Sequence, residues 1–286
     1  MLLIVGSLVV IGSVIGGYAA PGGHLSVLFQ PFEVVIIVGA AIGGFIIGNP
    51  KSVLKRTGSG FAKMLKGPKY NKKSYLELLS LLYQIFKLAK TKGMLALESH
   101  VEKPEESSLF SQFPSVMKDH HVLVFLCDYL RMLTLGTENP HELEALIDQE
   151  LETHHHEANQ VSSALRTLAD SMPGLGIVAA VLGVIHTMGS ITEPPEVLGH
   201  LIGAALVGTF LGILLSYGFV GPMANSLQAV DEADAKYLQC IKVALLAHLQ
   251  GYPPAVSVEF ARKALLEADR PSFYEIEEAV GALPPV

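Results

Sequence analysis

The 20 lysine and arginine residues lie in only two blocks of the sequence, residues 51–170 and 231–286. Outside these blocks the chain is dominated by four long apolar runs, and the segments that join them there carry no basic residue. Cytoplasmic loops of membrane proteins collect lysine and arginine, whereas loops on the opposite side are depleted of both. The pattern predicts an integral membrane protein with two cytoplasmic parts, both termini in the cytoplasm and little chain outside.

Each apolar run is long enough to cross ~30 Å of hydrocarbon as a helix. We expect spans at residues 2–20, 32–48 and 172–191, and a fourth within 197–230. Residues 197–230 carry no charge, and as a helix they would measure about 50 Å, so this helix should project beyond the bilayer. The helix before the third span, from residue 140, should project likewise. A signal peptide is the competing interpretation of residues 2–20, but this run lacks a basic n-region.

The predicted fold class is an all-α integral membrane protein with four transmembrane helices, and with long helices extending into a helical cytoplasmic domain. We divide the chain into transmembrane helices 1 and 2 (1–50), a cytoplasmic helical domain (51–170), transmembrane helices 3 and 4 (171–222) and a cytoplasmic helical tail (223–286). Apolar periodicity and capping residues predict the cytoplasmic helices from Ser74, over 116–133, from Asn139 and Pro140 onward, over 231–249 and over 257–268.

Motifs for catalysis or cofactor binding are missing from the sequence. The run from His154 to His156 would point in three directions on a helix, about 100° apart, and so cannot converge on one metal ion. Gly174, Gly176 and Ala179 imitate part of a dinucleotide fingerprint, but no strand precedes them. The formal net charge of −7 disfavours nucleic acid as a partner. We therefore expect neither an enzyme nor a protein with a cofactor or resident metal.

Charged residues avoid the core of every predicted span. Glu33, Glu193 and Glu196 fall at the outer ends of the spans, and His186 and His200 are the only ionisable residues at depth. Hydrogen-bonded packing is the expected role of both histidines. Because ion pathways in membranes normally use a buried carboxylate, a chain of this kind that helps to move ions needs a carboxylate from another protein.

Small residues recur at a spacing of four in the second and fourth spans, which places each set on one helix face. The sets are Gly39 and Gly43, Gly44 and Gly48, Gly199 and Gly203, and the stripe Ala204, Gly208, Gly212 and Ser216. Such faces let two helix backbones approach closely. Packing within the chain explains any one set as well as packing between chains does. Four spans leave little interior to fill, however, so contacts with other chains are expected.

Six stretches, in this order, are typical of one protein family: GGYAAPGG, QPFEVVIIVGAAIGGFIIGNP, ENPHELEALIDQELETH, DSMPGLGIVAAVLGVIHTMGS, LVGTFLGILLSYGFVGPMA and VEFARKALLEADRPSFYEIEE. The chain resembles, nearly end to end, the A-type proteins of bacterial flagellar motor stators, whose family includes the energy transducers ExbB and TolQ. Proteins similar to ExbB usually have three spans, so the first hairpin favours the stator.

The resemblance implies a stator protein that forms an ion channel with a B-type stator partner, here expected to conduct protons, and that couples ion flow to torque on the rotor. It implies a ring of copies, five in the family's architecture, around two copies of the B-type partner. That partner is a single-span, peptidoglycan-binding protein that supplies the missing aspartate. The resemblance also implies the bacterial inner membrane as location and a rotor switch-complex protein as second partner.

Two alternatives to the stator stay open. One is an ExbB- or TolQ-like proton-driven energiser of cell-envelope processes. The other is a passive membrane scaffold, which would show no phenotype that depends on ions.

Four residues match ion-coupling positions of the resembled family. Pro173 and Pro222 match prolines that couple ion transfer to movement, although the end of a helix is an equally natural place for proline. Thr209 matches a pore-lining position near the aspartate of the B-type partner. Ala180 stands where sodium-driven relatives carry threonine, and because alanine offers no oxygen ligand it favours protons over sodium.

Three charged residues match rotor-facing positions within the predicted cytoplasmic domain. Lys90 and Glu98 match a basic and an acidic position, and Glu150 matches a further charged site. Lys90 stands where arginine is usual, which keeps the charge and loses the planar guanidinium fork. Without the resemblance, each residue would be assigned to a solvated charged face.

Overall fold

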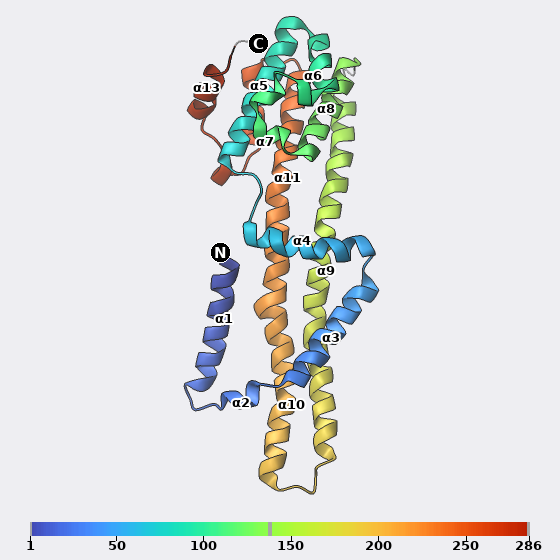
Figure 1. Ribbon diagram of the computed structural model, residues 1–286, viewed down its shortest axis with the longest axis vertical. Helices are drawn as coiled ribbons and strands as arrows, with labels where there is room; N and C mark the ends of the chain where they lie inside the picture. Colours follow the sequence, from blue (N-terminus) through green and yellow to red (C-terminus); the bar gives the residue numbers. More distant parts are fainter. Residues whose placement is uncertain (1, 137–138, 285–286) are drawn as a thin grey trace. The chain divides into compact units, whose positions relative to one another are not determined.

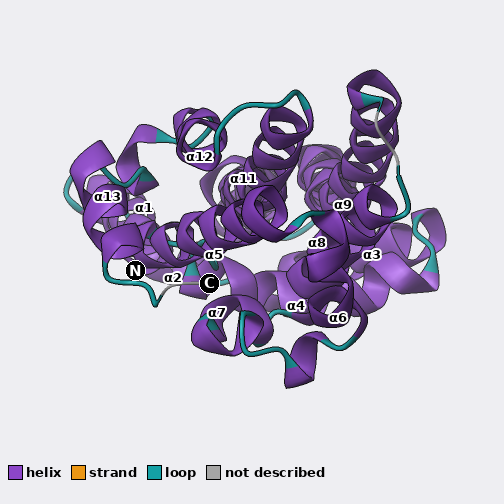
Figure 2. Ribbon diagram, turned by 90° about the horizontal axis from the view of Figure 1, so that it is seen from above, coloured by secondary structure: helices purple, strands orange, loops and turns teal. Residues whose placement is uncertain are grey.

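The computed structural model describes residues 2–136 and 139–284, and every regular element in these residues is a helix (Figure 1, Figure 2). The chain forms two compact units. Unit 1 comprises Met1–Gly67 and Glu157–Val230, and unit 2 comprises Pro68–His156 and Asp231–Val286. The all-α fold class predicted from the sequence is confirmed.

Within the described residues, four stretches form helices that are long and apolar enough to cross a membrane. Unit 1 holds α1 (Leu2–Ala19), α2 (Leu25–Leu28), α3 (Pro31–Gly48), α4 (Lys51–Lys66), α9 (Pro140–Met188) from residue 157, α10 (Pro195–Leu215), the single π-helical turn η4 (Ser216–Val220) and α11 (Gly221–Leu249) up to residue 230. The four predicted spans are confirmed, and so is the helical continuation of the third span back to residue 140.

The first helix, α1, has no buried residue within the single chain. Its apolar side chains are exposed on every side, Leu8 at 64% and Val9 at 61% among them. A helix that is apolar all round is stable only where its surroundings are apolar as well. Lipid or neighbouring chains must therefore cover α1.

In unit 1, α9 and α10 run antiparallel and touch backbone to backbone (Figure 1). A Cβ atom added at Gly212 would lie 2.6 Å from the carbonyl oxygen of Met172, and one added at Gly176 would lie 2.7 Å from that of Gly208. Real Cβ atoms do not approach other atoms so closely, so glycine at these positions sets the distance between the two helices. Gly208 and Gly212 therefore serve packing within the chain.

The glycines of α3 behave differently. A Cβ atom added at Gly39, Gly43, Gly44 or Gly48 would meet no described atom within 4 Å. Their faces are open in the single chain, which leaves room for close approach by another helix. Contacts with other chains therefore remain a prediction for the glycines of α3. The small residues Gly208 and Gly212 of α10 are already explained by packing against α9.

The fourth long helix is interrupted by η4. The N–H group of Gly221 donates to the carbonyl oxygen of Ser216, five residues earlier, which makes one wide turn. Pro222 follows at once, and proline both lacks an N–H group and collides with the carbonyl four residues before it. The wide turn absorbs this conflict, as single π turns in helices commonly do.

The helix α4 is amphipathic and packs with its apolar face against the other helices of unit 1. Its buried face includes Val53, Gly60 and Met64, and a Cβ atom added at Gly60 would lie 3.2 Å from the Leu227 side chain. Its opposite face carries lysine and arginine. Such a helix buries its apolar stripe against the helices beneath it and keeps its charges in water or near headgroups.

Unit 2 is organised around α5 (Lys72–Lys92), whose first turn is capped by Asn71: its side-chain oxygen accepts from the N–H groups of Lys73 and Ser74 at 3.0 and 3.1 Å. Side chains of α5, Phe86 and Leu82 among them, are completely buried in one large cluster. The other elements are η1 (Met94–Leu97), α6 (Glu98–Glu102), η2 (Pro104–Glu106), η3 (Phe110–Gln112), α7 (Pro114–Met117), α8 (His120–Thr134), α9 to residue 156, α11 from residue 231, α12 (Pro254–Lys263), η5 (Glu267–Asp269) and α13 (Phe273–Gly281).

The structure corrects the predicted helices of unit 2 in three places. The helix predicted over 116–133 is two helices, α7 and α8, because Asp119 adopts a non-helical backbone with ψ of 84°. The helix predicted over 257–268 begins at Pro254 and ends at Lys263. The helix α13 was missed, although its capping box of Ser272 and Glu275 is a signal visible in the sequence.

Asp119 also anchors the chain that enters unit 2 after α4. Its side chain is only 7% exposed, lies 2.7 Å from the Lys69 ammonium and accepts a hydrogen bond from the Tyr70 hydroxyl. The Tyr70 ring stacks on Tyr237 of α11 at 3.8 Å between centroids. Burial acts to raise the pKa of the Asp119 carboxyl, but the bonds from Lys69 and Tyr70 outweigh burial and hold the pKa below its ordinary value of 3.8.

We expect Asp119→Asn to lower the free energy of unfolding of unit 2 by about 1–3 kcal/mol, because it leaves the Lys69 and Tyr70 donors without their charged acceptor. Since folding lowers the pKa of Asp119, its stabilisation is complete above the ordinary pKa and is lost as pH falls through the lower folded value. Melting curves at neutral and acidic pH measure both effects. Asp128→Asn is the control, because that carboxylate is 59% exposed and should contribute under about 0.5 kcal/mol. Equal losses in the two variants would contradict the assignment.

Candidate functional site

The candidate site lies in unit 1, where the backbones of α9 and α10 meet. A Cβ atom added at Gly208 would lie 3.0 Å from the backbone nitrogen of Ala180, and one added at Gly176 would lie 3.3 Å from the Cα atom of Thr209. Ala180 and Thr209 thus flank one contact between the helices. The structure brings these two sequence-predicted residues together.

Pro173 lies toward the other end of this contact, and Pro222 lies in α11, beyond the π turn that follows α10. Pro173 follows Met172, whose carbonyl oxygen faces Gly212 of α10, and it is accommodated inside the long α9. Pro222 lies beyond the π turn and is exposed. Proline in a helix removes one backbone hydrogen bond, so both positions are local weak points of otherwise regular helices.

Sequence reasoning missed one residue of the site, Glu33. It was assigned to the outer edge of the second span, but its carboxylate reaches the contact between α9 and α10. A Cβ atom added at Gly183 would lie 3.5 Å from Oε1, and one added at Gly208 would lie 2.9 Å from Oε2. Oε2 is buried and accepts no hydrogen bond from any described residue. The available signal was the glycine at each facing position, which leaves space for a side chain from a third helix.

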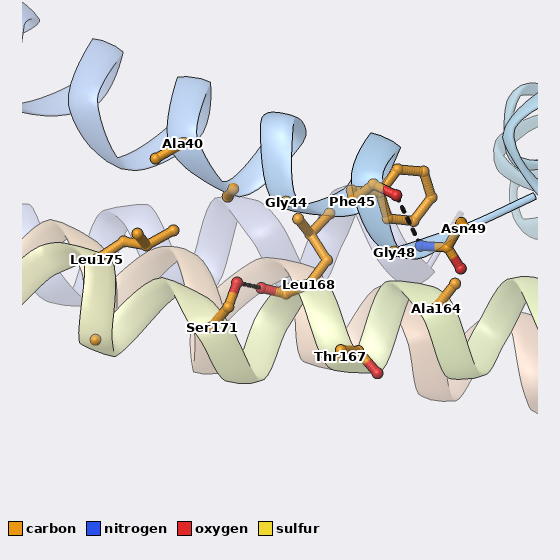
Figure 3. A pocket seen from close by; sticks show the side chains of 12 residues that line it. Ala40, Gly44, Phe45, Gly48, Asn49, Ala164, Thr167, Leu168, Ser171 and Leu175 are labelled. Carbon is orange, nitrogen blue, oxygen red and sulfur yellow. Dashed lines mark hydrogen bonds between the residues drawn. The ribbon is translucent and has the colours of Figure 1, made fainter.

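A groove of about 530 Å³ runs between α3 and α9 (Figure 3). Figure 3 shows Ala40, Gly44 and Phe45 of α3 across from Leu168 and Leu175 of α9. The polar side chains in the groove bond to their own helices: Ser171 Oγ donates to the Leu168 carbonyl at 2.7 Å, Thr167 Oγ1 to Ser163 at 3.1 Å and Asn49 Nδ2 to Phe45 at 2.8 Å. The groove therefore offers an apolar packing surface and not an ion site.

The sequence-predicted rotor-facing residues lie in unit 2. Lys90, in the last turn of α5, and Glu98, in the first turn of α6, are both exposed. The chain reverses between them at Gly93, whose φ of +87° is a conformation that favours glycine.

Glu150 differs from these two residues. It accepts a hydrogen bond from the Tyr129 hydroxyl, and its carboxylate lies 3.6 Å from Nε2 of His154. Burial and the Glu150 carboxylate together raise the pKa of the Tyr129 phenol. Glu150 is therefore already engaged within unit 2, whereas Lys90 and Glu98 are presented at the surface. Among the described residues, no group of three histidine, cysteine or acidic side chains is placed to hold a metal ion.

Two family models match the chain. The model described as Motility protein A N-terminal matches residues 4–93, and the model described as MotA/TolQ/ExbB proton channel family matches residues 119–239. Motility protein A of Salmonella typhimurium is 47% identical over 283 residues, which cover 99% of this chain and 96% of the relative. Chemotaxis protein LafT of Vibrio parahaemolyticus is 37% identical over 273 residues, 96% of each chain.

Solved structures share the fold. The C. jejuni MotAB structure superposes with a TM-score of 0.76 at 20% identity, covering 94% of this chain and 98% of that one. The flagellar MotAB stator complex from Bacillus subtilis gives a TM-score of 0.70 at 24% identity, covering 90% and 92%. At these identities the likeness establishes the arrangement of helices within a chain.

We expect Gly212→Ala to destabilise unit 1 by about 1–3 kcal/mol, because the added methyl group collides with the Met172 carbonyl and the helices must separate. Gly199→Ala on the same helix is the matched control, since nothing lies within 4 Å of the added atom; its higher helix propensity should leave stability unchanged or raised by up to about 1 kcal/mol. Thermal unfolding of the two purified variants measures the difference. Unfolding of both at the same temperature would show that the α9–α10 contact tolerates a side chain.

Proposed function

We propose a detailed stator function from one premise: this chain belongs to the Motility protein A group of the MotA/TolQ/ExbB proton channel family. It is a multi-pass inner-membrane protein and a component of the flagellar stator proton channel. The observation that carries this function is the match over nearly the whole chain to Motility protein A, at 47% identity over 283 residues. The details of its assembly, the conducted ion and the roles of individual residues are our proposals.

The proposed partner is the B-type stator protein, a single-span, peptidoglycan-binding protein that contributes the ion-binding aspartate. Two MotAB complexes share the fold of this chain. Copies of the chain would form a ring around this partner, five in the family's architecture, with both termini in the cytoplasm. The uncovered apolar surface of α1 and the open glycines of α3 support this proposal, since a ring of copies and the surrounding lipid would cover them.

The conducted ion is proposed to be the proton. Ala180 has no side-chain oxygen, and of the two proposed pore residues only Thr209 carries a hydroxyl group. Sodium requires several oxygen ligands to replace its hydration shell, whereas a proton needs one acceptor at a time. The pair therefore supports proton conduction.

Pro173 and Pro222 are proposed to couple ion transfer to movement of α9 and α10. Each interrupts the hydrogen-bond ladder of its helix, and Pro222 does so next to the wide turn η4. A helix can change direction at such a point without breaking further backbone hydrogen bonds. Protonation of the partner's aspartate would then alter packing at the α9–α10 contact, and these two points would transmit the change along the helices.

Lys90 and Glu98 are the proposed contacts with the rotor switch-complex protein. Their exposure and opposite charges suit a surface that recognises a complementary pair of charges. Glu150 is proposed to act indirectly, because its carboxylate is bonded to Tyr129. It would set the local charge of this surface and hold α8 against α9.

The function is tested by rotation of tethered cells that lack their own stators and are supplied with this chain and its genomic partner. We expect rotation to continue when sodium is withdrawn and to stop when a protonophore is added. Rotation that stops on sodium withdrawal would overturn the proton assignment. If both proteins reach the membrane of cells with a compatible rotor and nothing turns, the ExbB- or TolQ-like alternative replaces the stator.

We expect Lys90→Glu and Glu98→Lys each to reduce swimming speed to less than about half, because each reversal places like charges across the rotor contact. Reversing the charge of the rotor residue that faces the altered position should restore swimming speed for that variant. Lys118→Glu is the control, since Lys118 belongs to the same unit and lies outside the proposed contact. Unaltered swimming in both reversals would remove these residues from the rotor contact.

A further inference from the structure

Glu33 occupies a position that the proposed function does not yet use. The helix α3 begins at Pro31, alongside the α9–α10 hairpin, whose turn extends beyond it (Figure 1). Glu33 lies in the first turn of α3, and its side chain points into the hairpin at the level of Gly183 and Gly208.

This level lies within the helical part of the α9–α10 hairpin. Gly183 lies about 8 Å along α9 from its end at Met188, and Gly208 about 20 Å along α10 from its start at Pro195. Both glycines belong to helices that are apolar enough to span a membrane. The buried Oε2 atom therefore lies against these two helices, although Glu33 as a whole is partly exposed.

The surroundings of the carboxylate are small and apolar. Gly183 and Gly208 form its two walls, and Ala205 closes the contact, since a Cβ atom added at Gly183 would lie 2.7 Å from the Ala205 Cβ. Oε2 is buried and has no hydrogen-bond partner among the described residues. A cation that would neutralise the group is not available from these helices, because residues 2–50 and 171–230 contain no lysine or arginine.

Other titratable groups on the neighbouring helices lie at the surface. His24 precedes α2, which packs on α10, and it is exposed. His186 near the end of α9 and His200 in α10 are exposed too, as are Glu193 and Glu196 around the turn. Among the described residues, none of these groups donates a hydrogen bond to Oε2 of Glu33. None of these neighbouring groups therefore supplies a bonded charge that would hold Glu33 in one protonation state.

We propose that Glu33 is a proton-binding site of this chain, a relay between the outer side of the membrane and the level of Ala180 and Thr209. An unpaired carboxylate is costly in an apolar surrounding, and binding a proton removes the charge. A hydronium ion arriving from outside gives its proton to Oε2 and leaves as water. The neutral acid then donates the proton to the next acceptor inward, and Glu33 returns to its carboxylate form.

The site would select for protons by its construction. Its two nearest walls, Gly183 and Gly208, carry no side-chain oxygen that could help to complete the oxygen cage that sodium needs. Gly208 serves both the helix contact and this site, because a Cβ atom there would lie 3.0 Å from Ala180 and 2.9 Å from Oε2. This inference rests on the proposed proton conduction and assigns to it a residue of this chain.

The decisive variant is Glu33→Gln, which keeps the size and hydrogen-bonding shape of the side chain and cannot exchange a proton at neutral pH. We expect normal co-purification with the genomic partner, at least a tenfold loss of rotation speed at low load, and loss of the dependence of the remaining speed on external pH. Glu193→Gln and Glu196→Gln are matched controls, because they remove equally acidic but exposed carboxylates. Both should rotate at the speed of the unaltered chain with its pH dependence.

A second readout does not depend on the motor. Infrared difference spectra of the purified complex between acidic and alkaline pH should contain C=O bands of protonated carboxyl groups, and one band present with the unaltered chain should be missing from the spectrum of Glu33→Gln. Failure of the unaltered chain to rotate, with this band present, would refute the stator function and keep the proton site. If Glu33→Gln does not accumulate, Glu33→Asp takes its place and should shift the pH dependence of rotation. Rotation and spectra identical to the unaltered chain in the variant tested would overturn the proposal.

Discussion

The direct backbone contact between α9 and α10 is the constraint on which the membrane-spanning part of this protein depends. Gly176, Gly208 and Gly212 bring the two helices to a separation that no side chain would permit. Helices in lipid gain little from apolar burial, so close packing of small residues is a main source of their association. Because the contact is so close, small changes of angle or sliding between the helices change which residues meet across it.

Most of the residues proposed for the ion path lie at or next to that contact; Pro222, in α11, is the exception. Ala180 and Thr209 flank it, Met172 beside Pro173 ends it, and Gly208 leaves the space that Glu33 enters. A third helix, α3, thus contributes chemistry to a pair that is otherwise almost without polar side chains. Unit 2, in contrast, buries a large apolar cluster of its own around α5 and presents Lys90 and Glu98 at its surface.

Much of this fold was predictable, because the distribution of basic residues and the lengths of the apolar runs are properties of the sequence alone. Asn139 was correctly predicted to cap α9, and its side chain accepts from the N–H group of His141 at 3.1 Å. The depth of Glu33 was not predictable in this way. A residue three positions into a span looks peripheral, and only the offset between α3 and the hairpin, which is a matter of tertiary packing, places it inside. The hydrogen bond of Glu150 with Tyr129 has the same origin, because it joins α9 to α8 across 21 positions of the chain.

The π turn η4 has a further consequence for how the fourth long helix presents its residues. One extra residue in a turn advances everything after it by about 100° relative to an uninterrupted helix. Side chains before Ser216 and after Val220 that a helical wheel would draw on one stripe therefore lie on different sides of the helix. The stripe of small residues that ends at Ser216 does not continue in phase into α11. A long helix with one such wide turn can thus face two differently oriented neighbours. A relative with a regular turn at this point would present a rotated surface without any change of residue type.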